Sequence, residues 1–495
     1  MTGTLYGVGL GPGDPELMTV KAARLISEAA VIAYHSARHG RSIARSVAEP
    51  YLRAGQIEEK LVYPVTTETT DHPGGYEGAI ADFYELSAKR LAEHLDAGRD
   101  VVVLCEGDPF FYGSYMYMHE RLSGRFAAVV VPGVTSVSAA SSVLGRPLVQ
   151  RDEVLTILPG TLPAPELARR LADTDAAAVV KLGRTFGSVR EALAEAGKLD
   201  DAFYIERATW GEQRISPLAD VDPSTVPYFS LALLPSPAYA SRQAPAVSPV
   251  PSTAAGEVVV VGLGPAGPEW LTPEALAELE AAEHIVGYGP YVARVPQKAG
   301  QQRHASGNRV EADRAVEALS LAASGARVAV VSSGDPGVFA MASAVLEQVS
   351  SGHGAGVRVR IVPGVTAAQA AASRVGAPLG HDYCVLSLSD RLKPWEIIEK
   401  RLDAAGAADL VLALYNPASR TRTTQLADAR SVLLRHRSPS TPVVVARDVG
   451  GPEEDVRITT LGDLDSSTVD MRCLLIVGSS RTRAENGIVW TPRSY

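Results

Sequence analysis

Three short motifs, each present twice in the chain, combine glycines with polar side chains that suit ligand binding. They are a glycine-rich loop (GLGPGDPE and GLGPAGPE), the tripeptide GDP and the tetrapeptide PGVT, beginning at Gly9 and Gly262, Gly107 and Gly334, and Pro132 and Pro363. Glycine lets a ligand approach the backbone, aspartate accepts hydrogen bonds from hydroxyl or ammonium groups, and N–H groups at a helix start suit a carboxylate. Together the motifs predict a site for a zwitterionic ligand that carries a nucleoside.

Each motif also has a purely structural explanation, which the sequence leaves open. The glycines suit a tight turn. Asp108 and Asp335 suit a turn or a cap, and Thr135 and Thr366 suit plain N-capping of the helix that follows.

A dinucleotide site is disfavoured by the glycine-rich loop itself. Pro265 has no N–H to offer a phosphate. The next helix begins well after the glycines, with Thr272 as N-cap and Pro273 in its first turn. The following expected strand ends without the acid that would bind a ribose, and no P-loop motif is present.

Two basic stretches without acids follow the glycine-rich loops and suit an anionic substrate. The first lies within residues 35–48 and includes Arg38 and Arg41; the second lies within 284–310 and includes Arg294, Arg303 and Arg309. Arginine pairs with carboxylates in a bidentate way, so these side chains are candidate substrate-binding groups. A solvated charged loop explains the same residues.

Composition limits the classes of protein to consider. The net charge of −9 argues against a general nucleic-acid binder. No apolar run is long enough for a membrane span, and the first residues do not resemble a signal peptide, so we expect a cytoplasmic protein without a membrane partner. Cys105, Cys384 and Cys473 have neither disulfide nor metal-site spacing, so we expect reduced, buried thiols and no metal.

The elements that must position these motifs occur twice, which indicates a duplicated domain. Residues 8–19 and 261–272 are identical at 8 of 12 positions, and the GDP and PGVT blocks repeat in the same order. Alternating strands and helices in each copy predict an α/β fold, with two α/β subdomains and a cleft between them. We expect domains at 1–236 and 257–495.

A segment rich in Pro, Ala and Ser separates the two copies, at residues 237–256. Its composition is that of a flexible linker. We therefore expect it to tether the two domains without fixing them, so that each domain acts independently.

The ordered set of motifs resembles the S-adenosylmethionine-dependent tetrapyrrole methyltransferase family over nearly the whole chain, twice. YGVGLGPGDPELMTVKA, EGDPFFYGSYMYMHERL and YIERATWGEQRI resemble the precorrin-2 C(20)-methyltransferases. VGYGPYV, SSGDPGVFAMA, ALYNPASRTR and WTPRSY in the second copy resemble the precorrin-3B C(17)-methyltransferases. The resemblance implies a fused bifunctional enzyme of cobalamin biosynthesis, which methylates precorrin-2 at C(20) and precorrin-3B at C(17) with ring contraction.

The resemblance also implies which residues bind the methyl donor, S-adenosyl-L-methionine, mostly through backbone groups. In the first copy they are Pro12, Glu106, Gly107, Asp108, Phe111, Thr135, Ser136, Leu182 and Ala208. In the second they are Pro265, Ser333, Gly334, Asp335, Val338, Thr366, Ala367, Tyr415 and Val449. One departure is visible: Gly13-Asp14 in the first loop is replaced by Ala266-Gly267 in the second, which puts the second site in question.

Other functions remain open at this point. Another tetrapyrrole methyltransferase, such as one acting on uroporphyrinogen III, would share the loops, and a nucleotide-dependent oxidoreductase or a non-catalytic binding module are rivals of other classes. The sequence identifies no general base. Family resemblance further implies dimeric pairing, either as a homodimer or as an intramolecular pseudo-dimer of the two copies.

Overall fold

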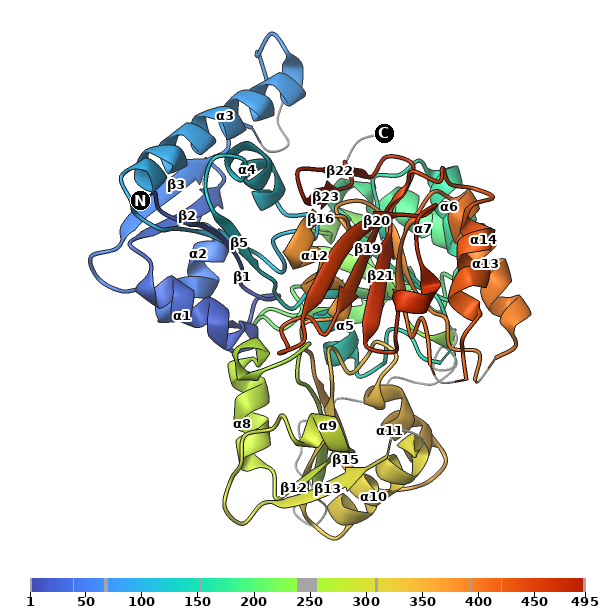
Figure 1. The fold of residues 1–495 in the computed structure, drawn as a ribbon. Helices are drawn as coiled ribbons and strands as arrows, with labels where there is room; N and C mark the ends of the chain where they lie inside the picture. The colour runs from blue at the N-terminus through green and yellow to red at the C-terminus, as the bar shows by residue number, and fades with distance from the viewer. Residues whose placement is uncertain are drawn as a thin grey trace. The chain divides into compact units, whose positions relative to one another are not determined.

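The computed structural model describes residues 2–38, 40–65, 70–151, 153–237, 256–307, 310–391, 393–419 and 421–492. The chain divides into two compact units, Met1–Thr135 and Ser136–Tyr495, called unit 1 and unit 2 here. The boundary between the units therefore falls inside the first copy of the repeat. Figure 1 shows the elements of each unit.

Unit 1 is a parallel five-stranded sheet with helices around it. The strand order is β3-β2-β4-β1-β5. The strands are β1 (Leu5–Gly9), β2 (Val31–Ser36), β3 (Ile57–Val62), β4 (Val101–Cys105) and β5 (Ala128–Val131), and the helices are α1 (Val20–Glu28), α2 (Ile43–Ala48), α3 (Gly75–Asp96) and α4 (Tyr115–Leu122). Because the strands are parallel, the residues that follow them meet at one edge of the sheet.

Unit 2 contains a second sheet of the same kind, from the start of the second copy. Its order, β13-β12-β14-β11-β15, repeats that of unit 1. The strands are β11 (Glu257–Gly262), β12 (His284–Tyr288), β13 (Gln302–Ser306), β14 (Arg327–Ser332) and β15 (Arg358–Val362), and the helices are α8 (Pro273–Ala281), α9 (Gly289–Val292), α10 (Glu311–Ala323) and α11 (Met341–Ser350). As expected, Thr272 caps α8 and Pro273 begins it.

The rest of unit 2 is built on one ten-stranded mixed sheet, to which both copies contribute five strands. Its order is β20-β19-β21-β18-β17-β6-β7-β10-β8-β9. The first copy supplies β6 (Leu155–Pro159), β7 (Ala176–Val180), β8 (Phe203–Glu206), β9 (Arg214–Pro217) and β10 (Ser230–Leu234), and the second supplies β17 (Tyr383–Ser387), β18 (Val411–Tyr415), β19 (Pro442–Arg447), β20 (Asp455–Thr460) and β21 (Cys473–Val477). The fold is thus a duplicated, mixed α/β fold.

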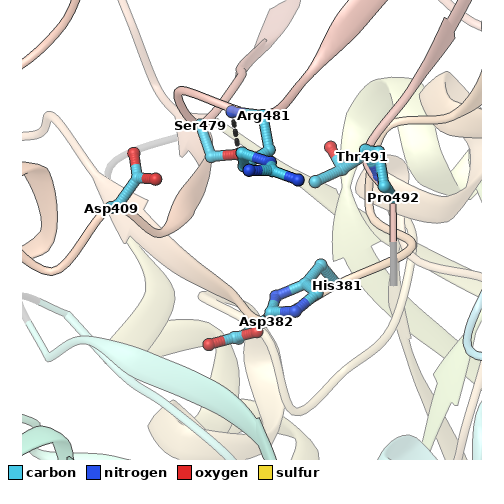
Figure 2. A pocket seen from close by; sticks show the side chains of 7 residues that line it. All are labelled: His381, Asp382, Asp409, Ser479, Arg481, Thr491 and Pro492. Carbon is cyan, nitrogen blue, oxygen red and sulfur yellow. Dashed lines mark hydrogen bonds and ion pairs between the residues drawn. The ribbon is translucent and has the colours of Figure 1, made fainter. Parts of the chain in front are cut away.

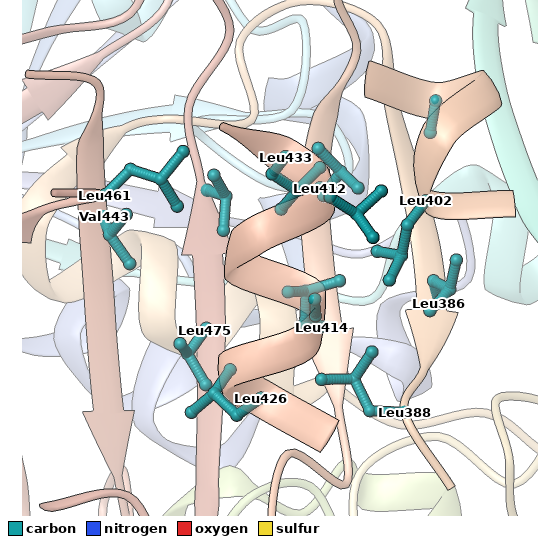
Figure 3. Packing of buried hydrophobic residues seen from close by; sticks show 14 of the residues in the cluster. Leu386, Leu388, Leu402, Leu412, Leu414, Leu426, Leu433, Val443, Leu461 and Leu475 are labelled. Carbon is teal, nitrogen blue, oxygen red and sulfur yellow. The ribbon is translucent and has the colours of Figure 1, made fainter. Parts of the chain in front are cut away.

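Helices cover this sheet in a way that also repeats. In the second copy, leucines of α13 (Trp395–Ala407) and α14 (Gln425–Leu433) pack with Leu412, Leu414 and Leu475 of the strands (Figure 3). In the first copy, α6 (Ala164–Ala172) and α7 (Phe186–Glu195) form the matching core. The remaining elements of unit 2 are α5 (Ser136–Leu144), α12 (Ala367–Val375), β16 (Gly376–Ala377), β22 (Arg483–Glu485) and β23 (Ile488–Trp490).

Strands β6 and β17 join the two copies within one chain. They pair antiparallel, with Thr156 opposite Cys384. Two ion pairs flank the junction: Arg170 of the first copy contacts Asp382 of the second, and Arg401 of the second lies 2.7 Å from Asp175 of the first. The expectation that only a linker joins independent domains is therefore wrong, because residues of both copies form one continuous sheet.

Two further expectations have clear outcomes. The three cysteines are free and buried, as expected. Within the described ranges, no helix combines the length and the apolar character that a membrane crossing requires.

We predict that a chain cut by a protease site introduced between Ala246 and Thr253 stays associated. The paired strands are fully buried, and an unpaired edge of this kind is unfavourable in water. Size-exclusion chromatography of the cut protein should show one species containing both fragments. Elution as two separate fragments would contradict the shared sheet.

The ion pairs provide a matched comparison for this experiment. The side chains of Arg170 and Asp382 are 5% and 1% exposed. Removing one partner of a buried pair costs about 3 to 5 kcal/mol when the other charge is left unpaired, and less here because His381 also contacts Asp382. The cut chain carrying Arg170→Ala should therefore dissociate at lower urea concentration than the cut chain without it.

Candidate functional site

In unit 1, the glycines of the three motifs lie where the three loops touch through their backbones. Gly11 and Gly107 form an isolated bridge, in which the Gly107 N–H donates to the Gly11 carbonyl at 2.8 Å. A Cβ atom added to Gly9 would lie 2.6 Å from the Gly133 nitrogen, and one added to Gly133 would lie 2.1 Å from the Gly107 oxygen. No side chain fits at Gly9 or Gly133, which explains the glycines of the glycine-rich loop and of the PGVT motif.

The second copy repeats this contact of three loops, called the loop junction below, at the ends of β11, β14 and β15. The Gly334 N–H donates to the Gly264 carbonyl at 2.8 Å. A Cβ atom on Gly364 would lie 2.4 Å from the Gly334 oxygen. Both copies therefore bring the glycine-rich loop, the GDP loop and the PGVT loop together.

Asp108 and Asp335 tie two of these loops to each other. Asp108 accepts from Phe110 N at 2.9 Å and Gly133 N at 3.1 Å, and Asp335 accepts from Gly337 N at 2.8 Å and Gly364 N at 3.1 Å. Both side chains are buried, and burial raises the pKa of Asp108 to about 7 and that of Asp335 to about 6. Of the two roles that the sequence left open, the contacts correspond to the turn role.

Open space adjoins Gly107 on the side where a side chain would project. Its φ is +66°, and a Cβ atom there would meet nothing within 4 Å. At Gly334, with φ +65°, the nearest atom would be Ala367 N at 3.8 Å. The GDP loop thus presents bare backbone to this space.

Non-glycine residues in the left-handed region recur at matching places in the two copies. Tyr112 and Phe339 follow the GDP motifs with φ of 55° and 50°. Lys181 and Asn416 follow β7 and β18, and Arg207 and Asp448 follow β8 and β19, with φ between 46° and 61°. Strained backbone of this kind gathers at binding sites, and here it lies directly after strands of the sheet.

The second copy's candidate residues can be followed across its two parts, because both lie in unit 2. The Tyr415 hydroxyl accepts from Ala368 N at 3.2 Å and also bonds Thr366. The Tyr415 ring lies 5.6 Å from that of Phe339 in the GDP loop. The structure therefore brings Thr366, Ala367 and Tyr415 close to the loop that contains Gly334, Asp335 and Val338.

The first turn of α12 is already hydrogen-bonded. Thr366 is its N-cap and accepts from Gln369 N at 3.3 Å, while Tyr415 takes the Ala368 N–H. A bound carboxylate would therefore find fewer free N–H groups at this helix start than the sequence suggests.

A second loop contact involves Trp270, which sequence reasoning missed. A Cβ atom on Gly450 would lie 2.6 Å from Trp270 Nε1, and the Arg374 guanidinium lies 5.3 Å from the Trp270 ring centre. The glycine-rich loop thus packs against the loop after β19, where Val449 is buried.

The remaining candidates lie at strand ends. Leu182 follows β7 and Ala208 follows β8, and both are buried. Glu106 is exposed at the end of β4 and accepts from Ala44 N at 3.1 Å. The others occupy the three loops described above: Pro12, Phe111, Thr135, Ser136, Pro265 and Ser333.

The replacement of Gly13-Asp14 by Ala266-Gly267 changes how the short 3-10 turn after the glycine-rich loop is capped. Asp14 caps a short 3-10 turn by accepting from Glu16 N at 2.9 Å. Gly267 holds the same place before the matching turn, with φ +69°. Because Asp14 serves the turn, its absence from the second loop is compatible with an intact second junction.

The candidate substrate-binding arginines differ in their surroundings. Arg38 and Arg41 are exposed, and their side chains have no hydrogen-bond or ion-pair partner among the described residues. Arg303 donates to the carbonyls of Val292, Val295 and Pro296 at 2.6 to 3.0 Å. Arg309 lies outside the described residues.

Arg294, from the second basic stretch, reaches the junction instead. Its guanidinium donates to the Gly264 carbonyl at 2.8 Å and to Ser333 Oγ at 3.1 Å. Burial lowers its pKa. Its place in the acid-free stretch was visible in the sequence, but nothing there distinguished it from its neighbours.

A partly buried histidine near the end of β2, whose Nε2 atom is buried, is a further feature of unit 1. The His35 ring stacks on Tyr63 at 5.3 Å and lies 6.0 Å from Phe83. Its Nε2 is buried without a partner among the described residues. Burial lowers the pKa of His35 to about 4.

A small pocket lies at the opposite ends of the strands. Figure 2 shows its lining residues, His381, Asp382, Asp409, Ser479, Arg481, Thr491 and Pro492. Asp382 precedes β17 and Asp409 precedes β18, whereas the loops of the junctions follow strands. Within the part of the chain that is described, no cluster of three His, Cys, Asp or Glu side chains could hold a metal ion.

Comparison with known proteins places the repeat in context. The family described as Tetrapyrrole (Corrin/Porphyrin) Methylases matches residues 4–222 and 257–465. Cobalamin biosynthesis protein CobIJ of Mycobacterium bovis is 61% identical over 501 residues, covering 100% of this chain and 96% of that protein.

Two shorter relatives each cover about half of the chain. Precorrin-2 C(20)-methyltransferase of a Sinorhizobium species is 51% identical over 234 residues, which is 47% of this chain and 95% of that protein. Precorrin-3B C(17)-methyltransferase of a Sinorhizobium species is 46% identical over 247 residues, which is 48% of this chain and 97% of that protein.

We predict that His35 makes the chain less stable at low pH. Its pKa is lowered from 6.5 to about 4 on folding, so its contribution is present above pH 6.5 and is lost as the pH falls through 4. Between pH 7 and pH 5 the native chain should lose about 2 kcal/mol more than His35→Phe, measured by urea unfolding. An equal loss in both proteins would contradict a buried neutral histidine, and exposed His353→Phe serves as the control.

Proposed function

Because the chain belongs to the tetrapyrrole (corrin/porphyrin) methylase family, we propose that it is a bifunctional S-adenosylmethionine-dependent methyltransferase of cobalamin biosynthesis. The first half, residues 1–236, methylates precorrin-2 at C(20). The second half, residues 257–495, methylates precorrin-3B at C(17) with ring contraction. The observation that carries the proposal is the duplicated three-loop junction, combined with half-length relatives that have these two names. We place the reactions in the cytoplasm.

The methyl donor binds once in each half, against the bare backbone of the GDP loop. Gly107 and Gly334 leave space beside the loop, and the flanking residues supply backbone N–H and C=O groups. The residues of the two donor sites are those given above, from Pro12 to Ala208 and from Pro265 to Val449. Asp108 and Asp335 contribute by holding the loops in place.

The reaction depends mainly on the correct orientation of the donor and the substrate. The sulfonium donor supplies an activated methyl group, and a reduced tetrapyrrole is an electron-rich carbon nucleophile. Correct alignment of two bound reactants is worth up to about 7 to 11 kcal/mol of the barrier. The rigid loop junction serves this purpose, because its backbone contacts leave little freedom for the GDP loop to move.

The substrate's carboxylates are met by local positive charge. Arg38 and Arg41 of the first half carry exposed guanidinium groups with no partner among the described residues, which suit bidentate contacts with carboxylates. We propose Arg303 and Arg309 for the second half, although Arg303 already holds three carbonyls. The negative net charge is no obstacle, since screening over about 8 Å makes the local charge decisive.

Product analysis tests the proposed function directly. The purified chain is incubated with labelled S-adenosylmethionine and either precorrin-2 or precorrin-3B, and products are analysed by mass spectrometry. One label should be added to each substrate, at C(20) and C(17) respectively. Label transfer to uroporphyrinogen III alone, or transfer to neither precorrin, would contradict the proposal.

We predict that each chain binds two donor molecules, and that Gly107→Ala and Gly334→Ala each abolish one site. A Cβ atom at either glycine would project into the space assigned to the donor. Isothermal titration calorimetry should give a stoichiometry near two for the native chain and near one for each variant. A native stoichiometry near one would contradict the prediction.

Two other glycines provide matched controls for backbone strain. Gly55 and Gly300 also have positive φ, +91° and +80°, with nothing within 4 Å of an added Cβ. Alanine at such positions costs about 1 to 2 kcal/mol. Gly55→Ala and Gly300→Ala share this strain but should keep both donor sites, so loss of binding in them would point to a general folding effect.

We predict that Arg38→Ala combined with Arg41→Ala raises the KM for precorrin-2 at least several-fold and leaves donor affinity unchanged. The substitutions remove two exposed guanidinium groups that hold no structural contact among the described residues. Steady-state kinetics and calorimetry would check this, with exposed Arg53→Ala as the charge control. An equal loss of donor affinity would mean that the stretch serves the donor site.

The matching pair in the second half is Arg303→Ala with Arg309→Ala, assayed with precorrin-3B. Because Arg303 also bonds backbone carbonyls, urea unfolding must accompany this assay. A raised KM without lowered stability would assign the pair to the substrate.

A further inference from the structure

The GDP loop of the second copy contacts residues of the first copy. Val149 and Val338 form an isolated bridge. The Val149 N–H donates to the Gly337 carbonyl at 3.2 Å, and the Phe339 N–H donates to the Val149 carbonyl at 3.3 Å. A segment of the first copy is therefore hydrogen-bonded to both sides of Val338, a proposed donor-site residue.

Helix α5 of the first copy reaches the same loop with its serines. The Ser138 hydroxyl donates to the Asp335 carboxylate. A Cβ atom on Gly337 would lie only 3.0 Å from Ser141 Oγ. Ser142 Oγ donates to the Ile361 carbonyl at 2.5 Å, in the strand that leads to the PGVT loop. These contacts connect α5 to the GDP loop and to the strand that leads to the PGVT loop.

An ion pair fixes the end of this connection. Arg151 lies 2.6 Å from Glu347 on α11, the helix that follows the GDP loop. All of these residues belong to unit 2. The second copy's own Tyr415 contacts Phe339 of the same loop, so the loop lies between parts of both copies.

We propose that the first half completes the methyl-donor site of the second half, with Ser138 and Val149 as positioning residues for the GDP loop. The proposal rests on the proposed function, because it takes the loop at Gly334 to be a donor site. Ser138 acts through Asp335: its hydroxyl orients the carboxylate that holds the Gly337 and Gly364 N–H groups. Val149 fixes the backbone around Val338. The second methyl transfer therefore depends on the first half being folded in place.

The test uses the full chain carrying Gly107→Ala, so that calorimetry reports the second donor site alone. Ser138→Ala should weaken S-adenosylmethionine binding there about tenfold, as expected for loss of one hydrogen bond to a charged group. Ser138→Thr keeps the hydroxyl and should stay within about threefold of the parent. Ser230→Ala is the matched control, since Ser230 is also a buried serine of the first half and donates to the Pro227 carbonyl at 2.6 Å.

A pair of substitutions across the two halves gives an independent measurement. Gly337→Ala should weaken second-site binding, because the new Cβ would press on Ser141 Oγ. Adding Ser141→Ala removes that oxygen and should restore part of the lost affinity. If either residue had only a structural role, the effects of the two substitutions on second-site binding free energy would add.

The outcomes separate failure of this inference from failure of the proposed function. Unchanged affinity in Ser138→Ala, or an equal loss in Ser230→Ala, would overturn the inference while two donors still bind to the native chain. Additive effects of Gly337→Ala and Ser141→Ala would overturn it too. Absence of donor binding to the native second half would instead overturn the proposed function.

Discussion

Everything at the two candidate sites depends on backbone-to-backbone contact between three loops. At Gly133 and Gly364 an added Cβ atom would lie 2.1 and 2.4 Å from a carbonyl oxygen of the GDP loop, so these positions exclude every side chain. Buried aspartates then hold the loops together through N–H groups. A ligand that meets such a surface is recognised by backbone groups, which explains why no catalytic side chain could be named from the sequence.

Much of the fold could be predicted from residue patterns, and the features that could not be predicted were hidden for physical reasons. Strands such as β7, β18 and β21 were visible as apolar runs, and Thr272 and Pro273 marked a helix start. The edge strands β9 and β20 have no such apolar run, because their side chains are mostly half-exposed or exposed. The role of Arg294 depends on contacts with residues 30 and 39 positions away. The role of Trp270 depends on a contact with the distant Gly450. Periodicity in the sequence cannot reveal either contact.

The pairing of β6 with β17 could not be predicted from the sequence either. Both strands are buried along their whole length, which is the pattern of any interior strand and does not indicate the neighbour. Pairing them removes two exposed edges at once. The flanking charges, Arg170 with Asp382 and Arg401 with Asp175, favour one register because a shifted strand would leave a charge unpaired.

The two copies keep the same loop junction but differ in the charged groups beside it. Ser333 takes the place that Glu106 has in the first copy. In the second copy Arg294 binds Ser333 and the Gly264 carbonyl. In the first copy Glu106 accepts from Ala44 N. Arg41, which lies as far along the sequence from its glycine-rich loop as Arg294 does, is exposed. A shared backbone scaffold can therefore hold the proposed donor in both halves, while the charges next to it differ between the sites of the two proposed substrates.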